Sequence, residues 1–382
     1  TWRLQPGHQG NTSIIWPTPT PDSLKYYGYP EAANPSLFAE RVQKLHEQGV
    51  RAVPYLCLSY LSTACPEWPF FGRRWSMGAV DTSASDVAQY GAGFAQVSPV
   101  GKDFADFIVW KIKAFIDQYG VDGLYHDNTH PYGSRALDAG CGYRRDGKVY
   151  PTYPIMGYRD LYRRMYAVLK SYPRETFSMA HMSGKMTIPV LAYVDAILDG
   201  EHFRGRVRDN YLDLMGMDAF RAEYMGRQWG VMPYFLPERS TVNAQVELTR
   251  GLMALLMLHD SAVWNLHVDT AGANETLAAL DDFGYVQADF VGYFDDPAPA
   301  MTDLKDVYVS AYRQDGRTLL IVGNVGREDR HGAVSLNAAC FGGTLPAKAQ
   351  GWPDQEPLAM INGTLSVSVP GLGYRLVMLE WP

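Results

Sequence analysis

The stretch that decides the fold is Lys102–Asn128, which reads KDFADFIVWKIKAFIDQYGVDGLYHDN. Its first part carries apolar side chains at helical spacing, and Gly120 is a typical residue to end a helix. The run Val121–Asn128 then predicts a short apolar strand that ends in polar and charged side chains. A helix followed at once by a strand that is buried on both faces is typical of a parallel sheet covered by helices.

The same alternation of helix and strand extends in both directions from this stretch. Other predicted strands cover residues 13–16, 50–58, 176–181, 193–199, 231–236 and 262–268, and other predicted helices cover 36–49, 158–171, 217–227, 242–259 and 275–283. Six or seven such strands favour a (β/α)8 TIM barrel. The count falls short of eight, either because one strand is not recognisable or because the first lies upstream of Thr1. A doubly wound sheet is the alternative, but no glycine-rich nucleotide loop follows any of the strands.

The pattern changes near Pro297. From there apolar and polar residues alternate, and Asp315-Gly316 and Asn362-Gly363 are typical two-residue hairpin turns. We therefore expect a barrel over residues 1–296, with upstream parts possibly lacking, and a small antiparallel β-sandwich over 297–382. Residues 66–100 are rich in aromatic side chains but show no regular period, so they predict a long loop of the kind that often serves function.

Composition excludes several classes of protein. The chain has 382 residues and a formal net charge of −7, which argues against broad nucleic-acid binding. No apolar run reaches the ~18–20 residues that a membrane helix needs. The four cysteines form neither a metal-binding nor a disulfide pattern, so they leave the compartment undecided. A secreted or periplasmic location is favoured over a cytoplasmic one, and a homo-oligomer stays open.

Acidic residues follow several of the predicted strands. In a TIM barrel the active site lies at the carboxyl ends of the strands, where Asp127, Asp199, Glu201 and Glu238 fall in this sequence. Each could instead serve as a helix cap or a salt-bridge partner, but gathering carboxylates on one rim is costly unless the site uses them. Asp199 and Glu201 are two residues apart, so in an extended chain they face the same side. We expect Asp127 to be a nucleophile or stabilising base, and Glu201 or Asp199 to be a general acid.

Other polar and aromatic residues near the strand ends are candidates for substrate binding. The 25 tyrosines and nine tryptophans are many for this length, and fit either a well-packed core or a cleft that stacks on sugar rings. His181 and Trp264 could each lie either in the hydrophobic core or in the substrate-binding site. The predicted substrate-binding residues are Tyr125, His126, Asn128, His181, His202, Glu238, Trp264, His267, Trp68 and Trp75.

Paired acids among aromatic residues, without a cofactor motif, fit glycoside hydrolysis. One carboxyl must give a proton to the leaving oxygen, and the other must attack the anomeric carbon or activate water. No G-x-S-x-G or His-Glu-x-x-His motif is present, so a serine hydrolase and a zinc enzyme lack support, and we expect no cofactor and no metal. Two alternatives stay open. One is a non-catalytic carbohydrate-binding protein on a barrel scaffold, and the other is a metal-assisted hydrolase in which Asp199, Glu201 and His202 hold a divalent ion.

Some segments resemble known glycosidases. The run Val121–Asn128 resembles the strand of clan-D-type α-galactosidases that ends in the nucleophilic Asp. The region from about residue 50 to 238 is similar to uncharacterised catalytic domains like those of glycoside hydrolase family 123, through segments 123–128, 150–154, 199–203 and 220–230. This resemblance implies a barrel with a β-sandwich behind it. Family 123 enzymes are N-acetylgalactosaminidases that use an adjacent Asp-Glu pair, whereas this chain has only Asp199-Gly200-Glu201, so the resemblance does not extend to that mechanism.

Overall fold

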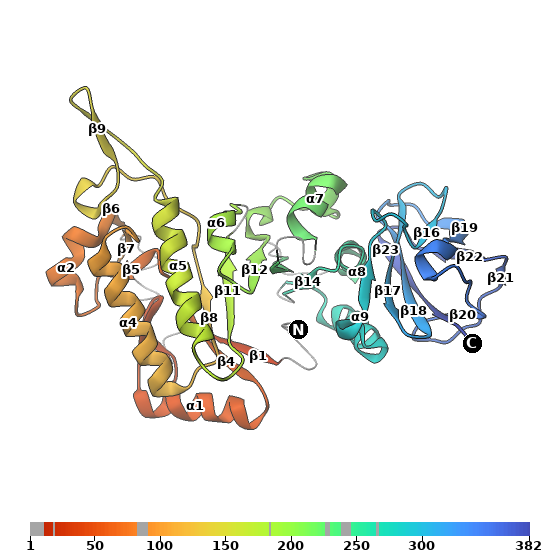
Figure 1. The fold of residues 1–382 in the computed structure, drawn as a ribbon, viewed down its shortest axis with the longest axis horizontal. Coiled ribbons are helices and arrows are strands. Elements are labelled where there is room, and N and C mark those ends of the chain that lie inside the picture. Colours follow the sequence, from red (N-terminus) through yellow and green to blue (C-terminus); the bar gives the residue numbers. More distant parts are fainter. Residues whose placement is uncertain are drawn as a thin grey trace.

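The computed structural model describes residues 11–17, 20–81, 91–182, 185–225, 230–237, 246–264 and 267–382. Two parts follow each other along the longest axis of the molecule, an α/β part that contains the amino-terminal half and a β part that contains the carboxyl terminus (Figure 1). Among the described helices, none combines the length and the apolar character that a bilayer-spanning segment requires.

Parallel strands form the central sheet of the α/β part. Their spatial order equals their order in the chain, as in a barrel: β1 (Thr12–Ile15), β4 (Arg51–Leu56), β8 (Gly123–His126), β11 (Phe177–His181), β12 (Ala196–Asp199), β13 (Met232–Phe235) and β14 (Ala262–Val263). The sheet curls so that its first and last strands approach each other: the ring centroids of Trp16, after β1, and Trp264, after β14, are only 6.4 Å apart. The predicted α/β barrel followed by a small β-sandwich is confirmed, although the described residues supply a 7-stranded sheet where the (β/α)8 fold has eight strands.

Helices cover the outer face of this sheet (Figure 1). Helix α4, Lys102–Tyr119, buries Ile108, Ile112 and Phe115, and it ends where Gly120 takes a left-handed conformation with φ +67°. The apolar residues that recur at helical spacing in the sequence therefore form the face of α4 that packs on the sheet. The other helices of this part among the described residues are α1 (Pro35–Glu47), α2 (Trp68–Trp75), α5 (Ile155–Lys170), α6 (Ile188–Leu191), α7 (Met217–Tyr224), α8 (Val246–Met257) and α9 (Thr270–Phe283).

Alternation along β8 separates the inside of the barrel from the helix layer. Tyr125 packs inside, in one cluster with Phe177 and Met179. Leu124 lies in the cluster that the helices complete. Since successive side chains on a strand point to opposite faces, Asp127 shares the inner side with Tyr125 and lies at the carboxyl end of the strand.

Residues 66–100 do not form a long loop, so that prediction is wrong. They contain α2 (Trp68–Trp75), β6 (Ser76–Asp81) and β7 (Phe94–Val97), and β7 pairs with both β6 and β5 (Tyr60–Ser62) in a small antiparallel sheet. The ring of Trp75 stacks on those of Phe71 and Phe107. The aromatic residues of this segment thus fill a local core, which their irregular spacing did not reveal.

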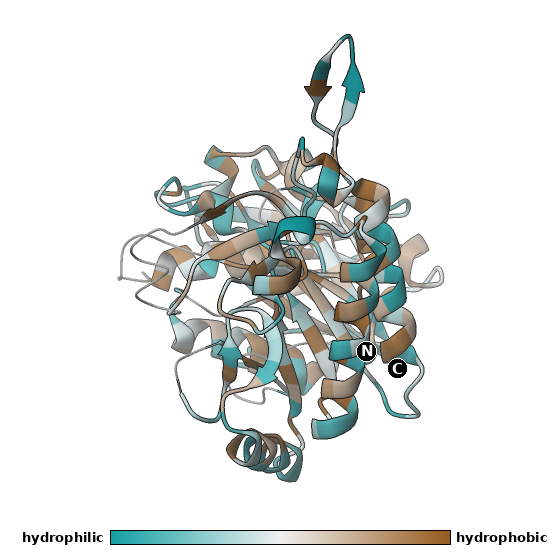
Figure 2. Cartoon of the chain, turned by 90° about the vertical axis from the view of Figure 1, so that its left-hand side faces the viewer, coloured by the Kyte–Doolittle hydropathy of each residue, from teal (hydrophilic) through white to brown (hydrophobic). Residues whose placement is uncertain are grey.

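A hairpin made by β9 (Tyr143–Arg145) and β10 (Lys148–Tyr150) projects from the α/β part, and Figure 2 shows it standing clear of the rest of the chain. Its turn, Asp146-Gly147, has positive φ angles at both residues, as a two-residue hairpin turn requires. The rings of Tyr143 and Tyr150 stack at its base with their centroids 5.4 Å apart. Another short hairpin, β2 (Leu24–Tyr26) with β3 (Tyr29–Ala32), follows β1.

The carboxyl-terminal part is a pair of antiparallel sheets. The predicted turns at Asp315-Gly316 and Asn362-Gly363 are confirmed, because they join β17 to β18 and β21 to β22. Strand β15 precedes the predicted boundary at residue 297 and already belongs to the larger sheet. That sheet is β15 (Asp289–Val291), β17 (Val307–Gln314), β18 (Arg317–Asn324), β23 (Gly373–Glu380) and β20 (Lys348–Gly351), and the smaller one is β16 (Ala300–Met301), β19 (Arg330–Leu336), β22 (Thr364–Val369) and β21 (Met360–Ile361).

The larger sheet packs against the end of α8. Ser310 Oγ donates a hydrogen bond of 2.9 Å to the carbonyl of Leu258, and the Tyr312 hydroxyl donates one of 2.9 Å to Asp260. The Leu258 side chain lies so close to Gly323 that a Cβ there would come within 2.6 Å of it. One apolar cluster therefore runs from the barrel helices into the sandwich.

Candidate active site

Asp127 lies directly after β8, at the carboxyl end of the barrel, and the residue is only 9% exposed. Its Oδ2 accepts hydrogen bonds from the Tyr27 hydroxyl at 3.0 Å, from Asn128 Nδ2 at 2.9 Å and from the Tyr55 hydroxyl. Its Oδ1 lies 3.0 Å from His181 Nδ1. Burial by itself would raise the pKa of Asp127, but the contacts with His181, Tyr55 and Tyr27 outweigh burial and hold the pKa below its ordinary value. The side chain is therefore an ionised carboxylate.

His181, at the end of β11, joins Asp127 to Glu201. Its Nδ1 faces Asp127 and also lies 3.0 Å from the Tyr125 hydroxyl, while its Nε2 lies 3.3 Å from Glu201 Oε2. Burial would lower the pKa of His181, but Asp127 foremost, and then Glu201 and Asp199, raise it above its ordinary value. His181 thus lies between two carboxyl groups that come from different strand ends, and these groups favour its protonated form.

Glu201 opens the short 3-10 helix η2 (Glu201–Phe203), and its side chain is 37% exposed. It pairs with His181 on one side and with Arg204, at 3.3 Å, on the other. This is the accessible carboxyl of the pair, whereas Asp127 lies deeper.

Asp199 and Glu201 do not lie on the same side, contrary to the prediction. Gly200 between them has φ +136°, and a Cβ at this position would lie 2.3 Å from the carbonyl oxygen of Leu236. The chain is therefore not extended here, and the alternation argument fails at this glycine. Asp199 is fully buried, with its Oδ1 accepting from Gly200 N at 2.6 Å and lying 3.1 Å from His202 Nδ1. A buried Asp199 holds its neighbours and does not present a carboxyl to a substrate.

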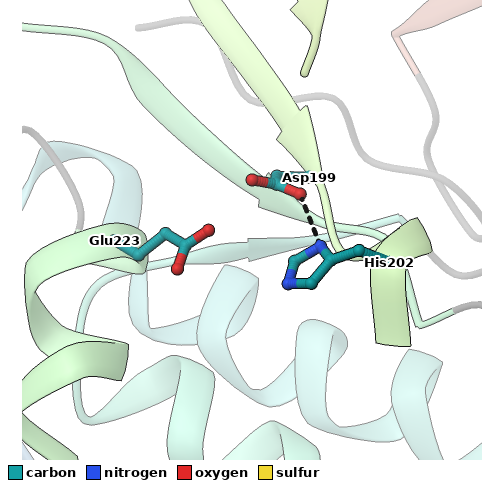
Figure 3. A group of neighbouring side chains, drawn as sticks. All are labelled: Asp199, His202 and Glu223. Atoms are coloured by element: carbon teal, nitrogen blue, oxygen red, sulfur yellow. Dashed lines mark hydrogen bonds and ion pairs between the residues drawn. The ribbon is translucent and has the colours of Figure 1, made fainter. Parts of the chain in front are cut away.

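Asp199, His202 and Glu223 form a second group beside the first (Figure 3). Glu223 lies on α7, and burial, then the charge of Asp199 and a hydrogen bond to it, raise the pKa of Glu223 to about 7. The sequence analysis assigned Glu223 no role, because nothing in the period of α7 marks it. The segment 220–230, which carries the resemblance to family 123, contains Glu223 and is the signal that could have found it.

Aromatic rings surround the Asp127 side of the site. Trp16 is 40% exposed, and its ring centroid lies 5.1 Å from that of Tyr55, 5.5 Å from that of Tyr125 and 6.4 Å from that of Trp264. Tyr55 and Tyr125 stack on each other and carry the hydroxyls that contact Asp127 and His181. The sequence analysis placed Trp16 at a strand end but gave it no role, although that place was a usable signal.

Two of the predicted substrate-binding residues lie away from this site. His126 is on the helix-facing side of β8, 1% exposed, with its ring edge-on to Tyr162. Burial lowers the pKa of His126 to about 3, so the ring is neutral. Successive side chains on a strand point to opposite faces, so His126 points to the helices when Asp127 points into the barrel. Trp75 is 2% exposed, with Asp103 accepting from its indole N–H at 3.2 Å, so it offers no free face to a sugar ring.

The remaining predicted residues are placed as follows. Trp68 begins α2 and packs against Gly72. His267 has φ +58° and lines a very small cavity with Thr249 and Leu252 of α8. Glu238 lies outside the described residues. The structure therefore brings together Tyr125, Asp127, Asn128, His181, Glu201 and Trp264, with Asp199 and His202 immediately behind Glu201.

No protein-family model matches the sequence, and no curated protein matches it. The fold, in contrast, is similar to many solved structures. The noncanonic maltogenic α-amylase AmyB from Thermotoga neapolitana superimposes with a TM-score of 0.59 at 11% identity, over 98% of this chain and 91% of that chain. The α-amylase from Geobacillus thermoleovorans in complex with acarbose gives 0.59 at 8% identity, over 97% and 88% of the two chains. Trehalose-6-phosphate hydrolase from Bacillus licheniformis gives 0.58 at 9% identity, over 97% and 92%. These similarities establish the fold over nearly the whole chain, and they do not show membership of family 123.

Proposed function

We propose that the protein is a glycoside hydrolase that uses Asp127 and Glu201 as its pair of carboxylates. The observation that carries the proposal is the placement of these two acids on opposite nitrogens of His181, at the carboxyl end of the barrel. The exposed ring of Trp16 lies beside them, as a platform for a sugar ring. The barrel-and-sandwich fold shared with α-amylases and a trehalose-6-phosphate hydrolase supports the same reaction class.

Asp127 supplies the negative charge that the reaction needs. A glycosidic bond breaks through a transition state with positive charge on the sugar ring, which an ionised carboxylate stabilises as nucleophile or as the base of a water molecule. The hydroxyls of Tyr27 and Tyr55 hold the carboxylate of Asp127 in one orientation and keep it ionised. His181 lies 3.0 Å from Asp127, which raises the pKa of His181 and so favours a compensating positive charge there.

Glu201 supplies the proton for the leaving oxygen. Of the two carboxyls it is the more exposed, so it can reach the oxygen of a bound glycoside. In the reaction Glu201 takes up a proton from His181 Nε2 and passes it to that oxygen, while the bond between the anomeric carbon and the oxygen breaks and Asp127 or a water molecule bonds to the anomeric carbon. His181 Nε2, which lies 3.3 Å from Glu201, is placed to return a proton to it for the next cycle.

The experiment is a rate measurement on a panel of aryl glycosides, α-glucans and oligosaccharides. On any substrate that the wild-type protein cleaves, we expect Asp127→Asn and Glu201→Gln each to lower kcat/KM by about 10²–10⁴-fold, since each removes a group that acts in the chemical step. Asp146→Asn, at the exposed tip of the projecting hairpin, is the matched control and should keep the wild-type rate. Wild-type rates in both site variants would rule out this pair of residues.

A carbohydrate-binding protein without catalysis is the second candidate, and one observation favours it. Tyr27, Tyr55, Asn128 and His181 all contact the carboxylate of Asp127, which leaves it few free lone pairs for attack. A carboxylate held in this way is well suited to accept hydrogen bonds in a fixed geometry. This candidate predicts saturable glycan binding, lost in Trp16→Ala, with no turnover of any substrate in the panel.

A further inference from the structure

Asp199, His202 and Glu223 come from three elements that meet in space. Asp199 ends β12, His202 lies in η2 just after the Gly200 turn, and Glu223 lies on the last turn of α7. One nitrogen or oxygen atom from each side chain lies within 4.8 Å of those from the other two. Figure 3 shows the three side chains pointing toward a common space between the end of β12 and α7. The arrangement is therefore convergent, although the residues are not a sequence motif.

The charges in this group call for a bound cation or proton. Asp199 is fully buried, and the carboxyl of Glu223 is close enough to hydrogen-bond with it. Two carboxyl groups side by side, one fully buried and the other half-buried, are costly unless a positive charge or a shared proton lies between them. The imidazole of His202 faces Asp199 at 3.1 Å, and an imidazole nitrogen is also a common metal ligand.

Tyr224 adjoins the same group. The residue is 0% exposed, and its hydroxyl is close enough to hydrogen-bond with the carboxyl of Glu223. The charges of Asp199 and Glu223 act directly on this hydroxyl, so it lies beside both carboxyls. The hydroxyl of Tyr224 is therefore a further oxygen atom beside the two carboxyls of this group.

We propose that Asp199, His202 and Glu223 form a binding site for a divalent transition-metal ion. Two carboxylates and one imidazole are ligands that Zn²⁺ and Mn²⁺ accept, whereas Ca²⁺ takes ~6–8 oxygen ligands. Three protein ligands leave a position open for water. Because His202 follows Glu201 in η2, a bound ion fixes this turn and with it the accessible acid of the site. The metal site does not depend on the proposed hydrolase activity.

The test is metal binding to the full chain after removal of metals with a chelator. Titration with Zn²⁺ in a calorimeter should show one ion per chain, and Co²⁺ should give visible absorption bands from coordination by the protein. Glu223→Gln and His202→Ala should each weaken Zn²⁺ binding by at least about 100-fold, since each removes a direct ligand. Thermal unfolding of the metal-free variants shows whether they are folded.

Glu201→Gln is the matched control, because it changes a neighbouring glutamate that is not among the three ligands and should keep wild-type Zn²⁺ affinity. The proposal is overturned if the folded wild-type chain binds Zn²⁺ and Co²⁺ more weakly than about 1 mM, if it binds only Ca²⁺, or if both ligand variants keep wild-type affinity. A chain that binds Zn²⁺ but cleaves no glycoside would support the metal site and contradict the hydrolase. A chelator-resistant glycosidase that binds no Zn²⁺ would do the reverse.

Discussion

Two tyrosines help to set the charge of Asp127. The hydroxyls of Tyr27 and Tyr55 both donate to Oδ2, and the two hydroxyls also contact each other at 2.6 Å. Hydrogen bonds to the ionised form lower the pKa of a carboxyl, whereas burial raises it. Since Asp127 is buried and still has a lowered pKa, its ionisation depends on these donors together with His181.

Tyr55→Phe should therefore raise the pKa of Asp127. One hydrogen bond to a charged group stabilises it by ~1.5–3 kcal/mol, which corresponds to about 1–2 pKa units. Because Asp127 acts in its ionised form, the acidic limb of kcat/KM against pH should move to higher pH by about that amount. Tyr162→Phe is the control, because its buried hydroxyl lies on the helix side of β8 and has no hydrogen-bond partner among the described residues. Identical limbs in the two variants would contradict this account.

His126 should make the protein sensitive to acid. Burial lowers the pKa of His126 to about 3, whereas an unfolded chain protonates a histidine near ~6.5. Between these values the unfolded state binds more protons, so the free energy of unfolding falls as the pH falls. His126→Phe removes the titrating ring, and from pH 7 to 4.5 the variant should lose about 2–3 kcal/mol less stability than the wild type. Urea unfolding at the two pH values measures this difference, and equal losses would exclude it.

At the scale of elements, the sequence was informative wherever one period dominates. The helix predicted from residue 102 to 119 has these bounds in the structure, because an apolar stripe and a terminal glycine both mark it. Strand β14 has only two residues where 262–268 was predicted, since an apolar run does not say how much of it finds a pairing partner. The strands within segment 66–100 were not predicted, because β6 and β7 are short and the segment shows no alternation of apolar and polar residues.

The candidate site was predictable in part, for the same reason. Residues that directly follow strands, such as Asp127 and His181, could be placed from the barrel alone. Position in the barrel and periodicity could not place Glu223, because its contact with Asp199 depends on how α7 packs in the tertiary structure; only the resemblance of segment 220–230 pointed to it. Asp199 and Glu201 do not face the same side as expected, because the backbone conformation of Gly200 between them depends on the tertiary structure.

Gly200→Ala tests that turn. A Cβ at Gly200 would collide with the carbonyl of Leu236, and φ +136° is strained for any other residue. We expect a loss of about 2–4 kcal/mol in the free energy of unfolding, and a large loss of activity because Glu201 moves. Gly216→Ala is the control, because a Cβ there meets nothing within 4 Å, so it should stay within about 1 kcal/mol of the wild type. Denaturant unfolding of both variants gives the comparison, and equal stabilities would contradict it.

At the scale of the whole molecule, the barrel and the sandwich share one apolar cluster and should unfold together. Leu258 is fully buried between α8 and Gly323, so Leu258→Ala should cost about 2–5 kcal/mol and lower the temperature of a single transition. Leu37→Ala, on the exposed side of α1, should cost less than about 1 kcal/mol. Calorimetry tests this, and two separate transitions of which only one shifts would show that the parts fold independently.

The projecting hairpin gives the chain a natural place to be cut. Arg144, Arg145 and Lys148 are exposed around its tip, so brief treatment with trypsin should cleave there first. The two fragments should stay together, because β8 before the cut pairs with β11 after it. We expect the nicked protein to elute from a sizing column as if intact and to separate only in detergent. Such behaviour would make the barrel a candidate for expression as two complementing halves.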